Sequence, residues 1–162
     1  MNYVRMSIEK ESPEQLGYEK IKNNLTETSV RDRNIKDLGL VIDDILLPYG
    51  DHLGDPRLRG IIARQSGVDD PNDVLVTAGA ASALFLVASS LLGPGDKMIV
   101  ARPNYGTNIE TPRAIGADIS YLDQKFEEGF KVDIEKLKSM IKPETKYISL
   151  TNPHNPTGTM MS

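Results

Sequence analysis

Residues 73–106 read DVLVTAGAASALFLVASSLLGPGDKMIVARPNYG, and this stretch decides the predicted fold. Val74–Val76 and Lys97–Ala101 are short β-rich runs, and residues 79–93 between them are apolar on almost every side. Such a segment is typical of a helix that is buried against a sheet. A strand, a helix and a second strand in this order predict a parallel sheet with a crossover helix.

The same alternation continues toward the C-terminus. Ile119–Leu122 and Tyr147–Leu150 are two further strand candidates, and Asp133 can cap a helix between them. We therefore expect an α/β domain with a mostly parallel sheet.

The chain before this region is less regular. Residues 1–38 are largely polar and charged, which indicates an arm, whereas residues 39–162 carry the domain. Leu58, Ile61 and Ile62 predict a short amphipathic helix that ends at Gly67.

Composition narrows the classes of function. A chain of 162 residues has room for one ordinary domain, and its 19 Lys and Arg against 23 Asp and Glu form no basic cluster for nucleic acid. The absence of cysteine excludes disulfides, thiolate catalysis and Cys-ligated zinc. His52 and His154 have no third ligand nearby, so we expect no metal site. No apolar run is long enough to span a membrane, and we expect a cytoplasmic protein.

The residues after each strand matter most, because ligands of open parallel sheets bind beyond the carboxyl ends of the strands. After the first strand candidate, residues 77–82 read TAGAAS and open a helix with small side chains. Free N–H groups at such a helix start bind phosphate, although close packing of helix and strand is an equal alternative. The segment is neither GxGxxG nor a P-loop, which argues against a Rossmann oxidoreductase.

The next two strand ends add an aromatic ring and a dense turn. Residues 101–106 read ARPNYG, so Tyr105 can lie flat on a planar ligand or pack on its own loop. Residues 151–158 read TNPHNPTG, which contains more turn-forming residues than an ordinary connection between a strand and a helix requires. A cis Asn-Pro bond there would aim an asparagine amide in a set direction.

In this order, YGDHLGDPRLR, TAGAASAL, PNY and NPHNPTG resemble the fold type I PLP-dependent aminotransferases of class I and II. The resemblance runs from about Gly39 to the last residue, and NPHNPTG is its most specific part. It implies a three-layer α/β/α sandwich with a mostly parallel sheet. Residues 1–38 would be an arm or small-domain segment, and residues 39–162 the N-terminal part of the large domain that binds pyridoxal 5′-phosphate (PLP), truncated after NPHNPTG.

The resemblance also implies the residues that bind the cofactor. Gly79, Ala80 and Ala81 would form the phosphate cradle, with backbone N–H donors from the two alanines. Tyr105 would stack on the pyridine ring. Asn155 would hydrogen-bond the ring hydroxyl oxygen and so help the cofactor to act as an electron sink.

Further residues follow from the same resemblance. Tyr49 resembles the tyrosine that crosses a dimer interface to the phosphate of the neighbouring subunit. Gly39 corresponds to a position near the substrate carboxylate, although the family's Gly-x-Pro context is absent here. Arg102–Pro103 and Asn155–Pro156 are the candidate cis bonds.

The catalytic residue itself is not assigned. In the family, the Schiff-base lysine lies well beyond NPHNPTG, so we expect it beyond Ser162 and expect the 162-residue chain alone to be inactive. The lysines of the predicted domain stand in charged, solvated surroundings that do not activate an amine: Lys97, Lys125, Lys131, Lys136, Lys138, Lys142 and Lys146.

The sequence thus predicts a homodimeric PLP-dependent aminotransferase of amino acid metabolism, with a biosynthetic role, that acts on an amino acid and a 2-oxo acid. One alternative is another fold type I enzyme, a lyase, decarboxylase or oxygen-using enzyme, in which residues 11–32 form a lid over the substrate. Another is a non-catalytic aminotransferase-like module for dimerisation or sensing.

Overall fold

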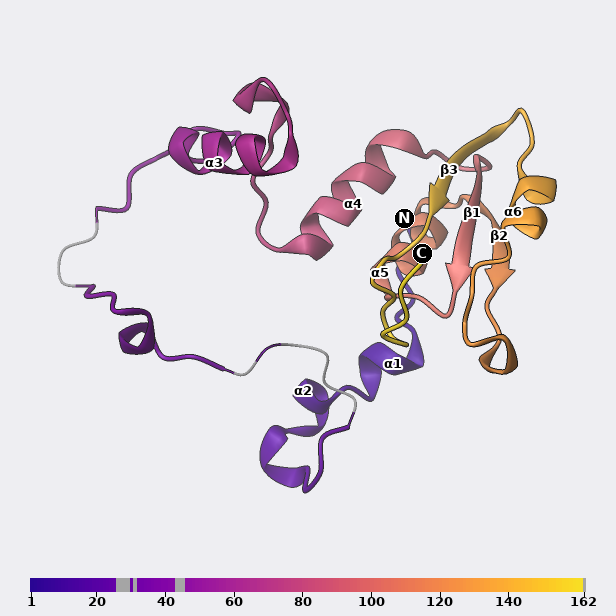
Figure 1. Ribbon diagram of the computed structural model, residues 1–162, viewed down its shortest axis with the longest axis horizontal. Coiled ribbons are helices and arrows are strands. Elements are labelled where there is room, and N and C mark those ends of the chain that lie inside the picture. The colour runs from indigo at the N-terminus through magenta and orange to yellow at the C-terminus, as the bar shows by residue number, and fades with distance from the viewer. Residues whose placement is uncertain (26–29, 31, 43–45, 162) are drawn as a thin grey trace. The chain divides into compact units, whose positions relative to one another are not determined.

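The computed structural model describes residues 1–25, 30, 32–42 and 46–161. Figure 1 labels α1 (Ser7–Lys10), α2 (Pro13–Leu16), α3 (Pro56–Ser66), α4 (Ala80–Leu91), β1 (Lys97–Arg102), α5 (Thr107–Ile115), β2 (Asp118–Asp123), α6 (Ile134–Met140) and β3 (Thr145–Ser149). Short 3₁₀ turns lie at Tyr18–Lys20, Ile35–Leu38, Pro71–Asp73 and Phe126–Glu128. Residues 26–29 and 31 of the predicted lid lie outside the described residues.

The chain is divided into two compact units. The first contains the described residues of Met1–Thr28 and Leu84–Ser162, and the second contains those of Ser29–Ala83. Across the described residues, none of the helices combines the length and the apolar character that a membrane span requires.

The first unit is built on a three-stranded parallel sheet in the order β2-β1-β3. Alternate side chains of β1 enter two separate cores, as expected of a strand with both faces covered. Met98 and Val100 pack with Ala88 and Leu92 at the end of α4 and with Ile109 of α5.

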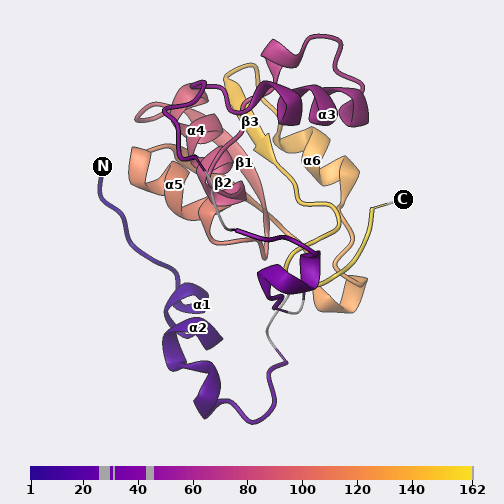
Figure 2. The same cartoon turned by 90° about the vertical axis from the view of Figure 1, so that its left-hand side faces the viewer.

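The opposite face of the sheet is covered by α6. Ile99 of β1 packs there with Leu122 of β2 and Leu137 of α6. Figure 2 shows α5 and α6 on opposite sides of the strands. The predicted three-layer α/β/α architecture with a parallel sheet is therefore confirmed.

Three of the predicted strands are present, and the fourth is not. Lys97–Ala101, Ile119–Leu122 and Tyr147–Leu150 correspond to β1, β2 and β3. The prediction for Val74–Val76 is wrong, because the Val74 N–H bonds back to Pro71 and the Val76 N–H bonds to the Leu53 carbonyl. Neither group joins the ladder of the sheet.

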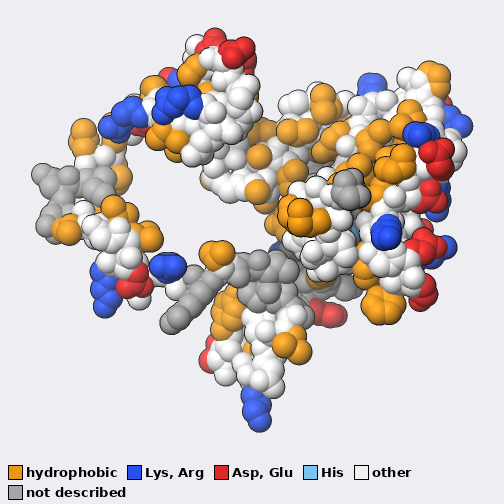
Figure 3. Space-filling view, in the orientation of Figure 1, with side chains coloured by type: hydrophobic (Ala, Val, Ile, Leu, Met, Phe, Trp, Pro, Cys, Tyr) orange, Lys and Arg blue, Asp and Glu red, His pale blue; other side chains and the backbone are white. Residues whose placement is uncertain are grey.

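The buried helix predicted at residues 79–93 forms as α4, but most of it is not buried. Ala88 is its one buried residue, whereas Phe85, Leu86, Val87 and Leu91 are 39–50% exposed. Figure 3 shows apolar side chains at the surface over α4. A three-stranded sheet is narrow, so it covers only the last turns of this apolar helix.

The predicted helix at residues 58–67 forms as α3 and ends at Gly67 in the left-handed conformation, φ 68°. Its buried face differs from the prediction. Leu58 and Ile61 are exposed, and Arg59 and Ala63 are buried instead. The buried guanidinium is matched by polar partners that the apolar periodicity does not reveal.

Helix α5 was not predicted, because Pro112 lies inside it and its buried face includes Asn108, Glu110 and Thr111. The N-terminal residues supply part of the matching polar groups. The Tyr3 hydroxyl lies 2.7 Å from Thr111 Oγ1, and the Met6 N–H donates to the Glu110 carboxylate.

The difference in burial between Leu122 and Leu91 predicts unequal losses of stability when each is replaced by alanine. Leu122→Ala removes a fully buried side chain and should lower the free energy of unfolding by about 2–5 kcal/mol. Leu91→Ala is the matched control, since that side chain is 50% exposed on α4, and it should cost less than about 1 kcal/mol. Urea unfolding measures both, and equal losses would contradict this assignment of the core.

Candidate active site

Two neighbouring loops follow the carboxyl ends of β1 and β3. β1 ends at Arg102 and β3 ends at Ser149, and the two strands are hydrogen-bonded in parallel. The loops at 103–106 and 150–161 therefore start at the same edge of the sheet, where parallel sheets bind ligands.

Asn104 joins the two loops. It is 3% exposed, and its Oδ1 accepts hydrogen bonds from the Tyr105 N–H at 2.8 Å, Asn108 Nδ2 at 2.9 Å and Thr151 Oγ1 at 2.8 Å. Its Nδ2 donates to the Ala101 carbonyl at 2.9 Å. One carboxamide thus connects the end of β1, the start of α5 and the loop after β3.

His154 makes the second connection between the loops. Its Nε2 donates to the Pro103 carbonyl at 2.9 Å, because a carbonyl can only accept. In the neutral ring, Nδ1 then accepts from the Thr157 hydroxyl at 2.6 Å. His154 is buried, and its two ring hydrogen bonds join the loop after β3 to the loop after β1.

Three X-Pro bonds in these loops are cis. The predicted cis bonds Arg102–Pro103 and Asn155–Pro156 are both present. Asn152–Pro153 is also cis and was not predicted.

The structure brings Tyr105 and Asn155 to these connected loops. Tyr105 follows Asn104 directly, and Asn155 follows His154 directly. Both side chains are half-buried, so each retains surface for a ligand. A planar ring and an amide are therefore presented at the edge where β1 and β3 end.

The predicted phosphate cradle lies in the second unit, at the start of α4. Gly79 adopts φ 83° with open space at its missing Cβ, and Ala80 and Ala81 are exposed. The first helical bond runs from the Ala83 N–H to the Gly79 carbonyl at 3.4 Å. The N–H groups of Ala80 and Ala81 precede it, as expected for donors that a helix leaves for an anion.

Tyr49 and Gly39 also belong to the second unit. Tyr49 is 94% exposed, and its ring meets His52 edge-on with 5.9 Å between the centroids. Gly39 ends the turn Ile35–Leu38 with φ 67°. Gly39, Tyr49 and the cradle are thus all residues of the second unit.

A cavity of about 480 Å³ lies beside the loop after β3 within the first unit. Thr151 and His154 line it together with Gln124, Phe130 and Met160. The Gln124 side chain donates to the Phe130 carbonyl at 2.6 Å, while its Oε1 is buried without a partner among the described residues.

An ion pair holds the ends of β1 and β2 together. Arg102 Nε lies 2.6 Å from Asp123 Oδ1, and its guanidinium also lies 4.4 Å from the centre of the Tyr121 ring. The hydrogen bond from Arg102 holds the pKa of Asp123 below its usual range. The pair therefore persists into more acidic solution than a free aspartate would allow.

The seven lysines that we judged unsuited to catalysis are all exposed, as predicted. Four form surface ion pairs: Lys97 with Glu144, Lys125 with Glu128, Lys138 with Glu135 and Lys146 with Asp96. The hydrogen bond with Glu128 raises the pKa of Lys125, which is the wrong direction for a nucleophilic amine.

Sequence reasoning missed the role of Asn104. A buried asparagine that bonds across 47 residues leaves no periodic signal, and PNY was read for its tyrosine alone. Its position two residues after a buried strand was the available clue.

Comparison with known proteins places the chain in a family. The model for "Aminotransferase class I and II" matches residues 18–162. Arginine–pyruvate transaminase AruH of Pseudomonas aeruginosa is 41% identical over 115 residues, which are 68% of this chain and 29% of that protein. Aspartate/prephenate aminotransferase of Thermus thermophilus is 35% identical over 115 residues, 68% of this chain and 30% of the relative. Capreomycidine synthase of Streptomyces vinaceus is 32% identical over 117 residues, 72% of this chain and 30% of that protein.

Solved structures of aminotransferases are also similar to this chain. Alanine aminotransferase from Pyrococcus furiosus has a TM-score of 0.63 at 37% identity, covering 70% of this chain and 30% of its own. A PLP-dependent aminotransferase from Streptococcus suis has a TM-score of 0.66 at 33% identity, covering 78% and 32%. The chain therefore spans about 30% of the length of the relatives that it matches.

The contacts of Asn104 predict a large loss of stability on its removal. Asn104→Ala leaves three donors without their acceptor and should lower the free energy of unfolding by about 3 kcal/mol, measured by urea unfolding. Asn152→Ala is the control, because exposed Asn152 accepts one bond, from the Met161 N–H, and should cost less than about 1 kcal/mol. Similar losses would refute the role of Asn104.

Proposed function

Because the chain belongs to the aminotransferase class I and II family, we propose that it forms part of a PLP-dependent aminotransferase that exchanges an amino group between an amino acid and a 2-oxo acid. The observation that carries this proposal is the pair of connected loops. Asn104 and His154 hold the two loops together. Tyr105 directly follows Asn104, and Asn155 directly follows His154.

The residues fit the chemistry of the cofactor. Gly79, Ala80 and Ala81 offer open space and backbone donors suited to a phosphate group. Tyr105 offers a half-buried ring to the face of a heteroaromatic ligand, and Asn155 offers an amide donor. When bound, PLP supplies the electron sink that allows bonds at the substrate Cα to break.

The protein's own part in this scheme is binding and orientation. Tyr105 would exclude water from one face of the ring, and the Asn155 N–H would stabilise negative charge on the ring hydroxyl oxygen. Gly39 would lie near the substrate carboxylate. The seven lysines are all exposed, so none of them lies in the desolvated surroundings that activate an amine for proton transfer at Cα.

A homodimer is part of the proposal. Tyr49 is 94% exposed, and Leu46 and Leu47 are 82% and 89% exposed, so this segment presents apolar surface of the kind that a partner subunit covers. Tyr49 would then reach the phosphate site of the neighbouring subunit. A cytoplasmic location and a biosynthetic role in amino acid metabolism remain predictions.

A second candidate is another reaction on the same cofactor. Capreomycidine synthase, whose name indicates a synthase and not an aminotransferase, is 32% identical to this chain over the matched residues. A lyase or oxygen-using enzyme would share the Tyr105 and Asn155 loops and would differ in the product. A non-catalytic module would bind the cofactor without turnover. Assays of the enzyme that contains this chain for amino-group exchange, and for any other consumption of the amino acid, therefore separate the three.

PLP binding tests the site. The purified chain should bind PLP reversibly, and Asn155→Ala should weaken binding by about tenfold through loss of one charge-assisted hydrogen bond, as measured by absorption titration. The exposed Asn152→Ala variant is the control and should bind as the wild type does.

Borohydride reduction completes this test. Since the lysines of the domain are exposed and largely ion-paired, no single lysine should be labelled in preference. Preferential reduction at one of them, or equal binding by both asparagine variants, would contradict the proposed site.

A further inference from the structure

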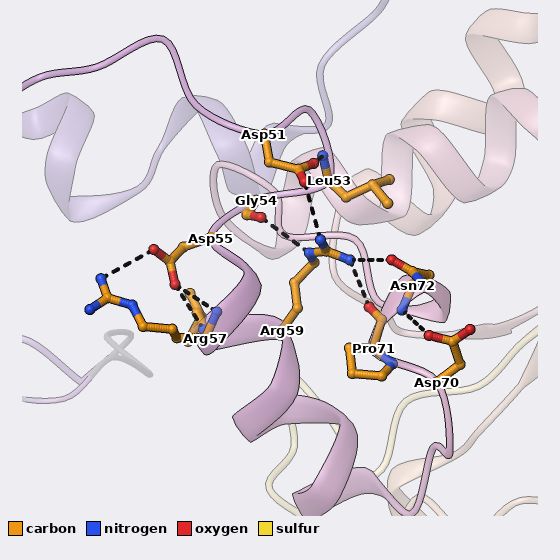
Figure 4. A network of polar contacts seen from close by, with 10 residues as sticks. Asp51, Leu53, Gly54, Asp55, Arg57, Arg59, Asp70, Pro71 and Asn72 are labelled. Atoms are coloured by element: carbon orange, nitrogen blue, oxygen red, sulfur yellow. Dashed lines mark hydrogen bonds and ion pairs between the residues drawn. The ribbon is translucent and has the colours of Figure 1, made fainter.

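The second unit contains a buried arginine that is not among the residues proposed to bind the cofactor. Arg59 of α3 is 4% exposed, although a buried cation is costly unless polar groups surround it. Figure 4 shows its guanidinium between two segments of the second unit, one before α3 and one after it.

The two segments contact different nitrogens of the same guanidinium. Before α3, the Gly54 carbonyl accepts from Nε at 3.1 Å and the Asp51 carboxylate lies 3.2 Å from Nη2. After α3, Nη1 donates to the Pro71 carbonyl at 2.9 Å and to Asn72 Oδ1 at 3.1 Å. Arginine has five N–H donors, and these contacts occupy most of them, so Arg59 has little capacity to bind a ligand itself.

The joined segments continue directly into the chain that leads to α4. The Leu53 carbonyl accepts from the Val76 N–H at 2.9 Å. Gly54 has φ 104°, and a Cβ placed there would lie 2.6 Å from Val76 Cβ, so the backbones meet at close range. Val76 stands three residues before Gly79, and Asp51 stands two residues after Tyr49.

We propose that Arg59 is a positioning residue for the cofactor phosphate: it fixes the segment that carries Tyr49 and the segment that leads to Gly79–Ala81 in one arrangement. This inference rests on the proposed function, because it takes both segments as phosphate-binding. Its planar fork of donors is required, since a lysine supplies one point charge that cannot reach both segments in the same geometry.

The test compares Arg59→Lys with Arg57→Lys in the full chain. Arg57 lies on the same helix, but its side chain is 91% exposed and, among the described residues, forms an ion pair with Asp55 alone. Each protein is titrated with PLP and with pyridoxal, which lacks the phosphate, and the ratio of the two dissociation constants is the readout. Amide hydrogen exchange at Val76 is measured in parallel.

The wild type and Arg57→Lys should prefer PLP over pyridoxal to the same degree. In Arg59→Lys, this preference should fall at least about tenfold, while the dissociation constant for pyridoxal changes little. The Val76 amide of this variant should also exchange faster. A general structural role would weaken both ligands equally. If Arg59→Lys does not fold, Asn72→Ala, which removes one contact of Arg59, should lose part of the same preference.

The outcomes separate the two proposals. A wild type without preference for PLP overturns the proposed function and this inference with it. A wild-type preference that Arg59→Lys or a folded Asn72→Ala fully retains overturns the role of Arg59 alone.

Discussion

The carboxamide of Asn104 fixes the end of β1 to the loop after β3, and the placement of Tyr105 and Asn155, the proposed ligand-binding residues of the first unit, depends on it. Three donors share its one oxygen, so a substitution unpairs groups on three segments at once. Buried polar groups that are fully paired specify a single arrangement. This arrangement sets the positions of Tyr105 and Asn155, because each directly follows a residue that joins the two loops.

The second unit uses the same physical solution. Arg59 is buried and paired with acceptors on both sides of α3, and the segments that it joins lead to Tyr49 and to Gly79. In both units, therefore, a buried polar side chain fixes irregular segments that have no sheet ladder of their own. Such segments carry function because a rigid scaffold positions them.

Local patterns in the sequence predicted the strands β1, β2 and β3 and a mostly parallel sheet, and the family resemblance implied the three layers and the cis bonds at Pro103 and Pro156. The local patterns failed where distant residues decide the outcome. Helix α5 buries polar residues that pair with the N-terminal segment, more than 100 positions away. Arg59, and not the apolar Leu58, is buried in α3 because Asp51 and Asn72 surround it.

The most direct measurement is a titration of the ¹⁵N-labelled chain with PLP, followed by NMR. The account predicts that the backbone amides of Ala80 and Ala81 and the side-chain amide of Asn155 shift together along one saturable curve. The side-chain amide of exposed Asn152 should stay unchanged and serves as the internal control. Shifts that leave Asn155 and the start of α4 unaffected would contradict the account, because PLP would then bind elsewhere on the chain.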